Sequence, residues 1–406
     1  MTIQELSNNN EHFTIYNLPY GIFSTPTKSK RVGIAIGNYI IDLSVLYDLN
    51  FFEGRIQNNV FSNETLNNFI ALGKEIWQFT RKKIYTLISE ESDFFNAHHT
   101  SFVYQQCSAV MHLPVNIGDY TDFYSSEEHA SNVGKMFRPN MEPLLPNWKQ
   151  MPIAYHGRSS SIITTKTPVR RPYGQVLKDE EVIYSASQTL DIEIELGFII
   201  GKENQLGTPI NINDATDYIF GAVLLNDFSA RDIQRWEYQP LGPFLGKNFA
   251  TSISPWIVPF EALKEFMTDA PTQTQTVLPY LQEAHRKNFD IEISFAIETK
   301  NKNKAVLAVS NAKYLYWTAE QQIAHHTVNG CNLRIGDLLG TGTISGKEKN
   351  SFGSLLELTW NGKEKLMVGT EERTFLQDGD TTILSAICKN ENKQIGFGEV
   401  SNLIIG

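Results

Sequence analysis

Three acidic residues at alternate positions of one apolar segment are the first feature of this sequence that could do chemistry. The segment DIEIELGFII, residues 191–200, places Asp191, Glu193 and Glu195 between apolar neighbours. This period of two predicts a half-buried β-strand whose acidic side chains share one face. Because neighbouring carboxylates repel one another, water, basic side chains or a bound cation must offset the repulsion.

Two further aspartates lie where they could join this acidic face. Asp227 ends the apolar segment AVLLND, and Asp122 lies in GDYTDFY. Functional sites are commonly built from side chains at strand ends, beside loops. Together with Glu193 and Glu195, these residues would supply hard oxygen ligands, which favour Mg²⁺ or Ca²⁺ over zinc. The alternative is an exposed strand face with incidental charges, and spacing alone does not show that the four residues meet.

A histidine at a predicted helix start is the candidate general base. In TDFYSSEEHASNVGKMFR, Ser125 and Glu128 fit a capping box, which places His129 in the first turn of a helix. The positive helix end favours a neutral imidazole, the form that accepts a proton. A partly exposed helical histidine without a catalytic role is the alternative. Glu357 lies inside the apolar segment SLLELTW, which we expect to be a strand, and a carboxylate there needs a histidine or a metal as partner.

The segment NDFSARDIQRWEYQPLGPFLGKNFATSISPW, residues 226–256, is dense in polar and aromatic side chains. Ser229 and Asp232 are predicted to cap a short helix after the preceding strand. The polar side chains that this helix and the following loop present are Arg231, Gln234, Tyr238, Lys247 and Thr251. Grouped Arg, Gln and Lys side chains could bind a carboxylate or stabilise a developing oxyanion. A structured surface loop with incidental charges is the alternative.

The glycines of GDLLGTGTISGKEKNSFGSLLEL, residues 336–358, do not form a nucleotide-binding motif. A phosphate loop requires Ser or Thr after its Gly-Lys pair, whereas Gly346 and Lys347 are followed by Glu348. We expect tight turns here that bring the backbone close to a ligand.

The elements that must position these residues are mostly strands. Segments rich in β-branched and aromatic residues, separated by Gly, Pro and Asn, predict strands at TLDIEIELGFIIG, YIFGAVLLND, FDIEISFAIET and TTILSAIC. TAEQQIAHHTV is the main helical pattern of this part, and KNKNK at 300–304 is expected at a hairpin tip. This combination favours a mainly β fold, a mixed roll or sandwich with few helices, over a doubly wound α/β sheet.

The beginning of the chain predicts a separate module. A turn at Gly37 and Asn38 is expected to join two strands, and an amphipathic helix follows over residues 69–88. The composition changes near HLPVNIGDYTDFYSS. We therefore expect a first domain over residues 1–115 and a catalytic, metal-binding domain over residues 116–406.

Composition and charge exclude several classes of protein. A hydrophobic content of 41% with 20% charged residues predicts a packed globular protein rather than a disordered one. The net charge of −10 argues against nucleic acid and anionic membrane surfaces as partners. No apolar run is long enough to span a bilayer, and the start MTIQELSNNNEHF does not predict a signal peptide. Three widely separated cysteines indicate a reducing compartment, so we expect a cytoplasmic enzyme.

Three long segments resemble the fumarylacetoacetate hydrolase family: GDYTDFYSSEEHASNVGKMFR, NDFSARDIQRWEYQPLGPFLGKNFATSISPW, and VNGCNLRIGDLLGTGTISG followed by SFGSLLEL. The resemblance covers nearly all of the larger part and, more weakly, the first module. It implies a small SH3-like N-terminal barrel, a larger β-roll and a homodimer. It also implies hydrolysis of a carbon–carbon bond in a small β-diketo acid, 4-fumarylacetoacetate. The products would be fumarate and acetoacetate, in the last step of tyrosine and phenylalanine degradation.

The resemblance further implies roles for individual residues. The family's metal ligands match Asp122, Glu193, Glu195 and Asp227, with Lys247 and Thr251 in the magnesium neighbourhood. The family's base matches His129, and the glutamate that orients this base matches Glu357. The stabilisers of the oxyanion and the carbanion match Arg231, Gln234 and Lys247. The substrate contacts match Tyr124, Arg138, Tyr155, Gln234, Tyr238 and Thr343.

Two other functions remain open at the level of sequence. Acylpyruvate hydrolases and hydratases of the same superfamily share an acidic metal site, and substrate profiling would separate them from the implied activity. A structural calcium site in a binding protein belongs to a different class. In such a protein His129 and Glu357 would have no reason to lie near the metal, so their separation in a structure is the discriminating observation.

Overall fold

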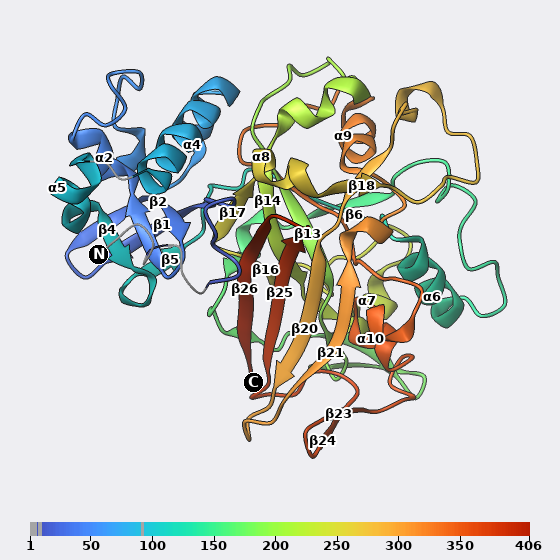
Figure 1. The fold of residues 1–406 in the computed structure, drawn as a ribbon. Coiled ribbons are helices and arrows are strands. Elements are labelled where there is room, and N and C mark those ends of the chain that lie inside the picture. Colours follow the sequence, from blue (N-terminus) through green and yellow to red (C-terminus); the bar gives the residue numbers. More distant parts are fainter. Residues whose placement is uncertain (1–5, 7–9, 91–92) are drawn as a thin grey trace.

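The computed structural model describes residues 6, 10–90 and 93–406, and most of its regular structure is β. One large sheet runs through the molecule, and a second sheet packs against it (Figure 1). This arrangement confirms the predicted mainly β class. No helix of the described residues is long and apolar enough to cross a membrane.

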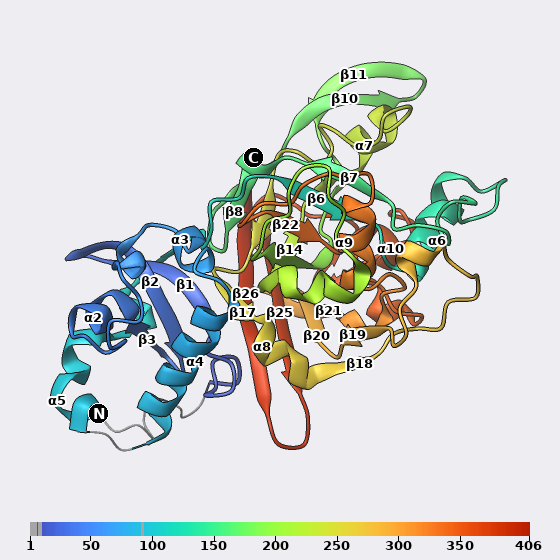
Figure 2. The same ribbon diagram turned by 90° about the horizontal axis from the view of Figure 1, so that it is seen from above.

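The N-terminal part combines a small set of strands with helices that flank them, and it lies beside the larger part of the molecule (Figures 1 and 2). Its strands are β1 (Tyr20–Thr25), β2 (Lys28–Ile36), β3 (Tyr39–Asp42), β4 (Val103–Gln105) and β5 (Val110–His112). Its helices are α2 (Leu43–Asp48), α3 (Asn67–Ile70), α4 (Lys74–Ser89) and α5 (Asp93–Phe102). The turn at Gly37 and Asn38 is confirmed, and Gly37 has a positive φ of 54°. The single helix predicted over 69–88 is wrong, because Gly73, at φ +86°, separates α3 from α4.

The N-terminal strands extend the sheet that holds the site. The main path of this sheet is β4-β3-β2-β1, then β17 (Trp256–Pro259), β14 (Ile219–Asp227), β13 (Ile194–Ile200), β22 (Leu338–Gly340), β6 (Tyr120–Phe123) and β7 (Ala154–Gly157). The pairing of β1 with β17 joins the two parts. At this bridge a Cβ on Gly21 would lie 2.5 Å from the ring of Trp256, so only glycine permits the approach. The expected boundary at 115/116 lies in the irregular segment between β5 and β6, and the division remains a prediction.

A five-stranded sheet covers the other side of the core. Its order is β21-β20-β25-β26-β9, with β20 at Glu292–Glu298, β21 at Lys304–Asn311, β25 at Thr381–Lys389, β26 at Gln394–Ile405 and β9 at Val169–Arg170. Leu196 and Leu224 of the large sheet share a buried cluster with Phe295 and Leu384 of this one. Each such side chain stabilises the fold by roughly 1.5–3 kcal/mol. The hairpin tip predicted at 300–304 is the turn between β20 and β21.

The centre of the large sheet positions the acidic residues. The strands concerned are β6 (Tyr120–Phe123), β7 (Ala154–Gly157), β13 (Ile194–Ile200), β14 (Ile219–Asp227), β16 (Thr251–Ile253) and β22 (Leu338–Gly340). In register, Asp122 lies opposite Gly340 and Tyr155, and Asp227 lies opposite Thr251. Side chains from separate stretches of sequence therefore meet on one face.

The segment that contains the acidic run differs from the predicted single, half-buried strand. It forms β12 (Leu190–Asp191) and β13, with Ile192 and Glu193 between them, and every residue from 190 to 200 is buried. The prediction was wrong on both counts, because its acidic side chains bind internal partners instead of water. The exposed-face alternative is also excluded by this burial.

Candidate active site

The four carboxylates predicted as metal ligands converge in the structure. One oxygen from each of Asp122, Glu193, Glu195 and Asp227 lies within 4.8 Å of the others, and all four side chains are buried. Asp122 comes from β6, Glu195 from β13 and Asp227 from the end of β14, while Glu193 precedes β13. Chain segments more than a hundred residues apart along the sequence thus build one acidic cluster.

The charges of this cluster are only partly compensated by the protein. Burial, together with the neighbouring carboxylates, raises the pKa of Asp122 and of Glu195 well above their usual values. The backbone N–H of Gly342 donates to both side chains, at 3.2 Å to Asp122 Oδ1 and 3.1 Å to Glu195 Oε2. The other oxygen of Glu195, Oε1, is buried without a hydrogen-bond partner among the described residues. An orphaned oxygen within a set of hard oxygen ligands fits a divalent cation.

Lys247 supplies the positive charge on one side of the cluster. Its Nζ lies 2.5 Å from Glu193 Oε2 and 2.7 Å from Asp227 Oδ2. Although burial opposes the charged form, these two carboxylates hold the pKa of Lys247 above its usual value. Thr251 donates from Oγ1 to Asp227 Oδ1 at 2.6 Å, and the Tyr155 hydroxyl donates to Asp227 Oδ2 at 2.9 Å. Lys247 and Thr251 thus lie against the acidic cluster.

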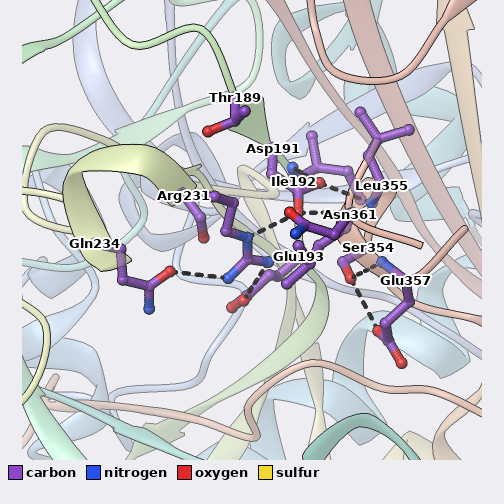
Figure 3. A network of polar contacts seen from close by, with 12 residues as sticks. Thr189, Asp191, Ile192, Glu193, Arg231, Gln234, Ser354, Leu355, Glu357 and Asn361 are labelled. Carbon is purple, nitrogen blue, oxygen red and sulfur yellow. Dashed lines mark hydrogen bonds and ion pairs between the residues drawn. The ribbon is translucent and has the colours of Figure 1, made fainter. Parts of the chain in front are cut away.

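Arg231 forms a second bridge (Figure 3). Its Nε donates to Asp191 Oδ2 at 2.8 Å, and its Nη2 pairs with Glu193 Oε1 at 2.8 Å. Its Nη1 donates to Gln234 Oε1 at 3.1 Å. Burial would raise the pKa of Glu193, but Lys247 and Arg231 outweigh it and hold that pKa below the usual value. Glu193 is therefore the carboxylate of the cluster that already has two cationic partners.

The helix that carries Arg231 begins differently from the prediction. Helix α7 spans Arg231–Glu237, and its N-cap is Ala230, without a side-chain hydrogen bond. The predicted capping by Ser229 and Asp232 is wrong. The carboxylate of Asp232 is engaged elsewhere, because it accepts from the Ser187 hydroxyl at 2.6 Å and from the backbone N–H of Gln188 at 2.7 Å.

His129 and Glu357 form a buried pair. His129 Nδ1 lies 2.7 Å from Glu357 Oε2. Burial would raise the pKa of Glu357, but His129 and the hydrogen bonds to the carboxylate lower it. The carboxylate is therefore an acceptor and Nδ1 is the donor. The ring of Tyr124 packs edge-on against the imidazole, with ring centroids 5.3 Å apart.

Both residues of this pair lie in the first turn of a helix. Helix α6 spans Glu127–Phe137, and its N-cap is Ser126, whose Oγ accepts the backbone N–H of His129 at 3.3 Å. The predicted cap at Ser125 was wrong by one residue, whereas the place of His129 in the first turn is confirmed. The strand predicted around Glu357 is wrong, because Leu355–Leu358 form the short helix α10. Ser354 caps α10, and the pattern Ser-x-x-Glu was the signal that identifies this helix start.

Some of the predicted substrate-contact residues touch the His129–Glu357 pair or the acidic cluster, and others do not. Tyr124 contacts His129, and Tyr155 donates a hydrogen bond to Asp227. The hydroxyl of Thr343 is buried without a hydrogen-bond partner among the described residues. A cavity of about 180 Å³ lies beside the cluster, with Tyr155 and Lys247 among its lining residues. Among the described residues, Arg138 and Tyr238 make no hydrogen bond or ion pair with the four carboxylates. Arg138 donates to the carbonyl of Pro143 at 3.1 Å, and the ring of Tyr238 lies 6.3 Å from that of Phe137.

Comparison with known proteins decides the family. The model of the fumarylacetoacetate hydrolase C-terminal domain matches residues 119–405, and that of the fumarylacetoacetase N-terminal domain matches residues 16–114. The chain belongs to the fumarylacetoacetate hydrolase family. The fumarylacetoacetase of Dictyostelium discoideum is 51% identical, over 97% of this chain and 95% of that protein. The human fumarylacetoacetase is 47% identical, over 97% of this chain and 96% of that protein.

The fold agrees with this family at lower sequence identity. A solved fumarylacetoacetate hydrolase from Exiguobacterium antarcticum superposes with a TM-score of 0.56 at 16% identity, over 96% of this chain and 99% of that one. At this identity the likeness concerns the fold alone. The family assignment therefore rests on the sequence matches, and the superposition shows that the two chains share a fold.

Sequence reasoning missed several polar groups of the site. Glu357 accepts hydrogen bonds from Asn132 Nδ2 at 3.0 Å, and from the hydroxyls of Ser345 and Ser354 at 2.9 Å each. Asn132 lies three residues after His129, on the same face of α6, and this spacing was an available signal. Asp191 was noted as acidic but received no role, although it contacts Arg231 directly.

Replacing Gly340 with alanine is expected to weaken cation binding. A Cβ at this position would lie 2.5 Å from Asp122 Oδ1 and 3.2 Å from Glu195 Oε2, so both carboxylates must move. Isothermal titration calorimetry with Mg²⁺ and with Ca²⁺ measures the effect. Gly197→Ala is the control, because the new Cβ would meet only apolar side chains, the nearest being that of Leu338 at 2.6 Å. Equal cation affinity of Gly340→Ala and the unchanged protein would contradict the assignment of the cluster.

Proposed function

We propose that the protein hydrolyses the carbon–carbon bond of 4-fumarylacetoacetate to fumarate and acetoacetate. The observation that carries this proposal is identity of 47–51% with proteins named fumarylacetoacetase, over nearly the whole length of each chain. The His129–Glu357 pair beside a buried acidic cluster supports hydrolysis chemically. The reaction would be the last step of tyrosine and phenylalanine degradation.

The acidic cluster is proposed to hold Mg²⁺ or Ca²⁺. Asp122, Glu193, Glu195 and Asp227 would be its ligands, since hard oxygen donors suit both cations. When bound, the cation supplies Lewis acidity toward the oxygens of the diketo acid. Lys247 and Thr251 keep the carboxylate of Asp227 oriented, and Arg231 and Lys247 do the same for Glu193.

The general base of the proposed reaction is His129. Because Nδ1 donates to Glu357, the other ring nitrogen, Nε2, takes the proton from water. The negative charge of Glu357 stabilises the imidazolium that forms. The hydroxide attacks the carbonyl carbon, and the bond to the neighbouring carbon breaks with its electron pair on the acetoacetate fragment. That carbanion is an enolate, which accepts a proton to give acetoacetate.

Arg231, Gln234 and Lys247 are proposed to stabilise the negative charge that develops during this reaction. Their cationic and amide groups lie on the side of Glu193 and Asp227, within a buried region where such interactions are strong. Tyr124, Arg138, Tyr155, Tyr238 and Thr343 are proposed to contact the substrate. Tyr155 is the best supported of these, because it lines the cavity beside Lys247.

Replacing Lys247 with methionine tests the stabilisation of charge, because the side-chain length is kept and the charge is lost. We expect kcat to fall by about 10²–10³-fold with little change in KM. Steady-state kinetics measure this, with Lys287→Met as control, since Lys287 pairs with Asp269 at the surface. A change confined to KM would instead make Lys247 a ground-state binder of the substrate carboxylate.

The structural-calcium alternative is disfavoured by the separation of His129 and Glu357. These residues form a 2.7 Å contact, and Asp191 hydrogen-bonds both to the start of α10, which carries Glu357, and to Arg231, which pairs with Glu193 of the cluster. A purely structural site would not require such a pair. Acylpyruvate hydrolysis is distinguished by assaying acylpyruvates in parallel with the diketo acid.

The decisive experiment follows the ultraviolet absorbance of 4-fumarylacetoacetate with purified protein, with and without a chelator. Loss of absorbance that stops with chelator and returns with Mg²⁺ or Ca²⁺ is the expected result. Absence of turnover with cation present would overturn the proposed activity. We also propose a cytoplasmic homodimer, which light scattering after size-exclusion chromatography and fractionation of cells would test.

A further inference from the structure

A fully buried aspartate outside the proposed ligand set connects the two halves of the site. Asp191 has no exposed surface and accepts four hydrogen bonds. Its Oδ1 accepts from the backbone N–H of Leu355 at 2.7 Å and of Ile192 at 2.8 Å. Its Oδ2 accepts from Arg231 Nε at 2.8 Å and from the backbone N–H of Leu356 at 3.0 Å. Figure 3 shows this carboxylate between Arg231 and the start of α10.

The partners of Asp191 belong to two different parts of the site. Leu355 and Leu356 are the first residues of α10, and Glu357, the partner of His129, follows them directly. Arg231, the other partner, forms an ion pair with Glu193 of the acidic cluster. The carboxylate of Asp191 therefore hydrogen-bonds both to the helix that carries Glu357 and to the arginine that pairs with Glu193.

The chemistry of Asp191 suits this connection. A carboxylate with two acceptor oxygens can satisfy donors on both sides at once, whereas an amide offers one acceptor and one donor group. A side chain that holds two separate elements in register by charge-assisted hydrogen bonds fixes geometry more strongly than neutral contacts do.

We propose that Asp191 is a positioning residue that sets the placement of Glu357 relative to Arg231 and Glu193. It acts through those residues and does not touch the substrate. The His129–Glu357 pair then meets its water at a fixed distance from the groups that stabilise the developing charge. Misplacement by about 1 Å costs on the order of 10²-fold in rate. The inference rests on the proposed function, since it concerns the rate of that reaction.

Asp191→Asn is the first test. The amide keeps the shape of the side chain, but its N–H₂ group replaces one of the two acceptor oxygens. In one orientation this group faces Arg231 Nε and the N–H of Leu356, and in the other it faces the N–H groups of Leu355 and Ile192. We expect kcat to fall by about 10–10²-fold with KM little changed. The effect should be non-additive with Glu357→Gln, because in that background the positioned group has already been lost.

Asp42→Asn is the matched control. Asp42 is also fully buried, accepts from Arg31 Nε at 2.5 Å, and accepts from the backbone N–H of Val45 at the start of α2, at 3.1 Å. It lies in the N-terminal part, away from the acidic cluster. Both variants should lower the melting temperature, but kcat of folded Asp42→Asn should stay within about twofold of the unchanged protein.

A spectroscopic measurement separates this inference from the proposed activity. The proton on His129 Nδ1 gives an imidazole N–H resonance, assigned by its loss in His129→Ala, that reports the contact with Glu357. Asp191→Asn should shift this resonance and Asp42→Asn should not, whatever the substrate of the enzyme is. If Asp191→Asn fails to fold, Asp191→Ser, which leaves room for water, is measured in the same way.

An unshifted resonance with unchanged kcat would overturn the positioning role, as would losses that multiply fully with those of Glu357→Gln. Failure of the unchanged protein to hydrolyse the diketo acid would overturn the proposed function instead. In that case the shift of the resonance still tests the connection through Asp191.

Discussion

Replacing His129 with alanine is expected to lower kcat by about 10²–10⁴-fold, the usual contribution of a general base. The imidazole is buried against Glu357 and Tyr124, and its removal leaves water without a group to take its proton. Stopped assays with 4-fumarylacetoacetate measure the loss, and circular dichroism and cation titration establish that the fold and the cluster are intact. Activity within tenfold of the unchanged protein would require a different base.

Glu357→Gln should cause a loss of similar order without disturbing the cluster. The amide no longer stabilises the imidazolium, and its N–H₂ group can select the wrong tautomer of His129. Asn132, Ser345 and Ser354 donate to the carboxylate in the unchanged protein, so the amide also leaves one or more of these donors unpaired. Residues that act as one unit are not additive. The double variant is therefore expected to be scarcely slower than His129→Ala alone.

Multiplication of the two losses in the double variant would be the contrary outcome. It would show that Glu357 acts independently of His129. Asn132→Ala provides a graded control, because it removes one hydrogen bond to Glu357 but leaves the contact with His129. Its kcat should fall by less than that of Glu357→Gln, and the loss should disappear in the Glu357→Gln background.

The acidic cluster could be predicted from sequence because carboxylates are unusual within and at the ends of apolar strand segments. Asp227 ends a strand, and Glu193 and Glu195 alternate with apolar neighbours. What the pattern could not supply was the environment. A period of two describes one face of a strand but does not state whether that face meets water or Lys247 and Arg231. The prediction of a half-buried strand failed for that reason.

The partners of Asp191 were out of reach for the same physical reason, and the pairing of Glu357 with His129 followed only from the family resemblance. Asp191 binds the backbone of Leu355, 164 residues later, and Glu357 binds His129 across 228 residues. Local propensity contains no information about contacts at such separations. Helix α10 was different, because Ser354 and Glu357 have the spacing of a helix start, and the apolar neighbours were mistaken for a strand.

Replacing Glu193 and Glu195 together with glutamine is expected to abolish cation binding and activity, because two of the four proposed ligands lose their charge. The single changes should differ in the absence of metal. Glu193 pairs with Lys247 and Arg231, so Glu193→Gln leaves buried cations with fewer partners. Breaking such a buried pair costs about 3–5 kcal/mol of unfolding free energy.

Glu195→Gln should behave in the opposite way. No cationic side chain pairs with Glu195 among the described residues, and its neighbours are carboxylates. Burial and these neighbours raise its pKa because they disfavour the charged form, and the amide removes this unfavourable charge. Its metal-free melting temperature should therefore stay unchanged or rise, while Mg²⁺ and Ca²⁺ affinity falls as in Glu193→Gln. Thermal unfolding in chelator and calorimetric titration measure the two properties, and a lower metal-free melting temperature for Glu195→Gln than for Glu193→Gln would refute this division of roles.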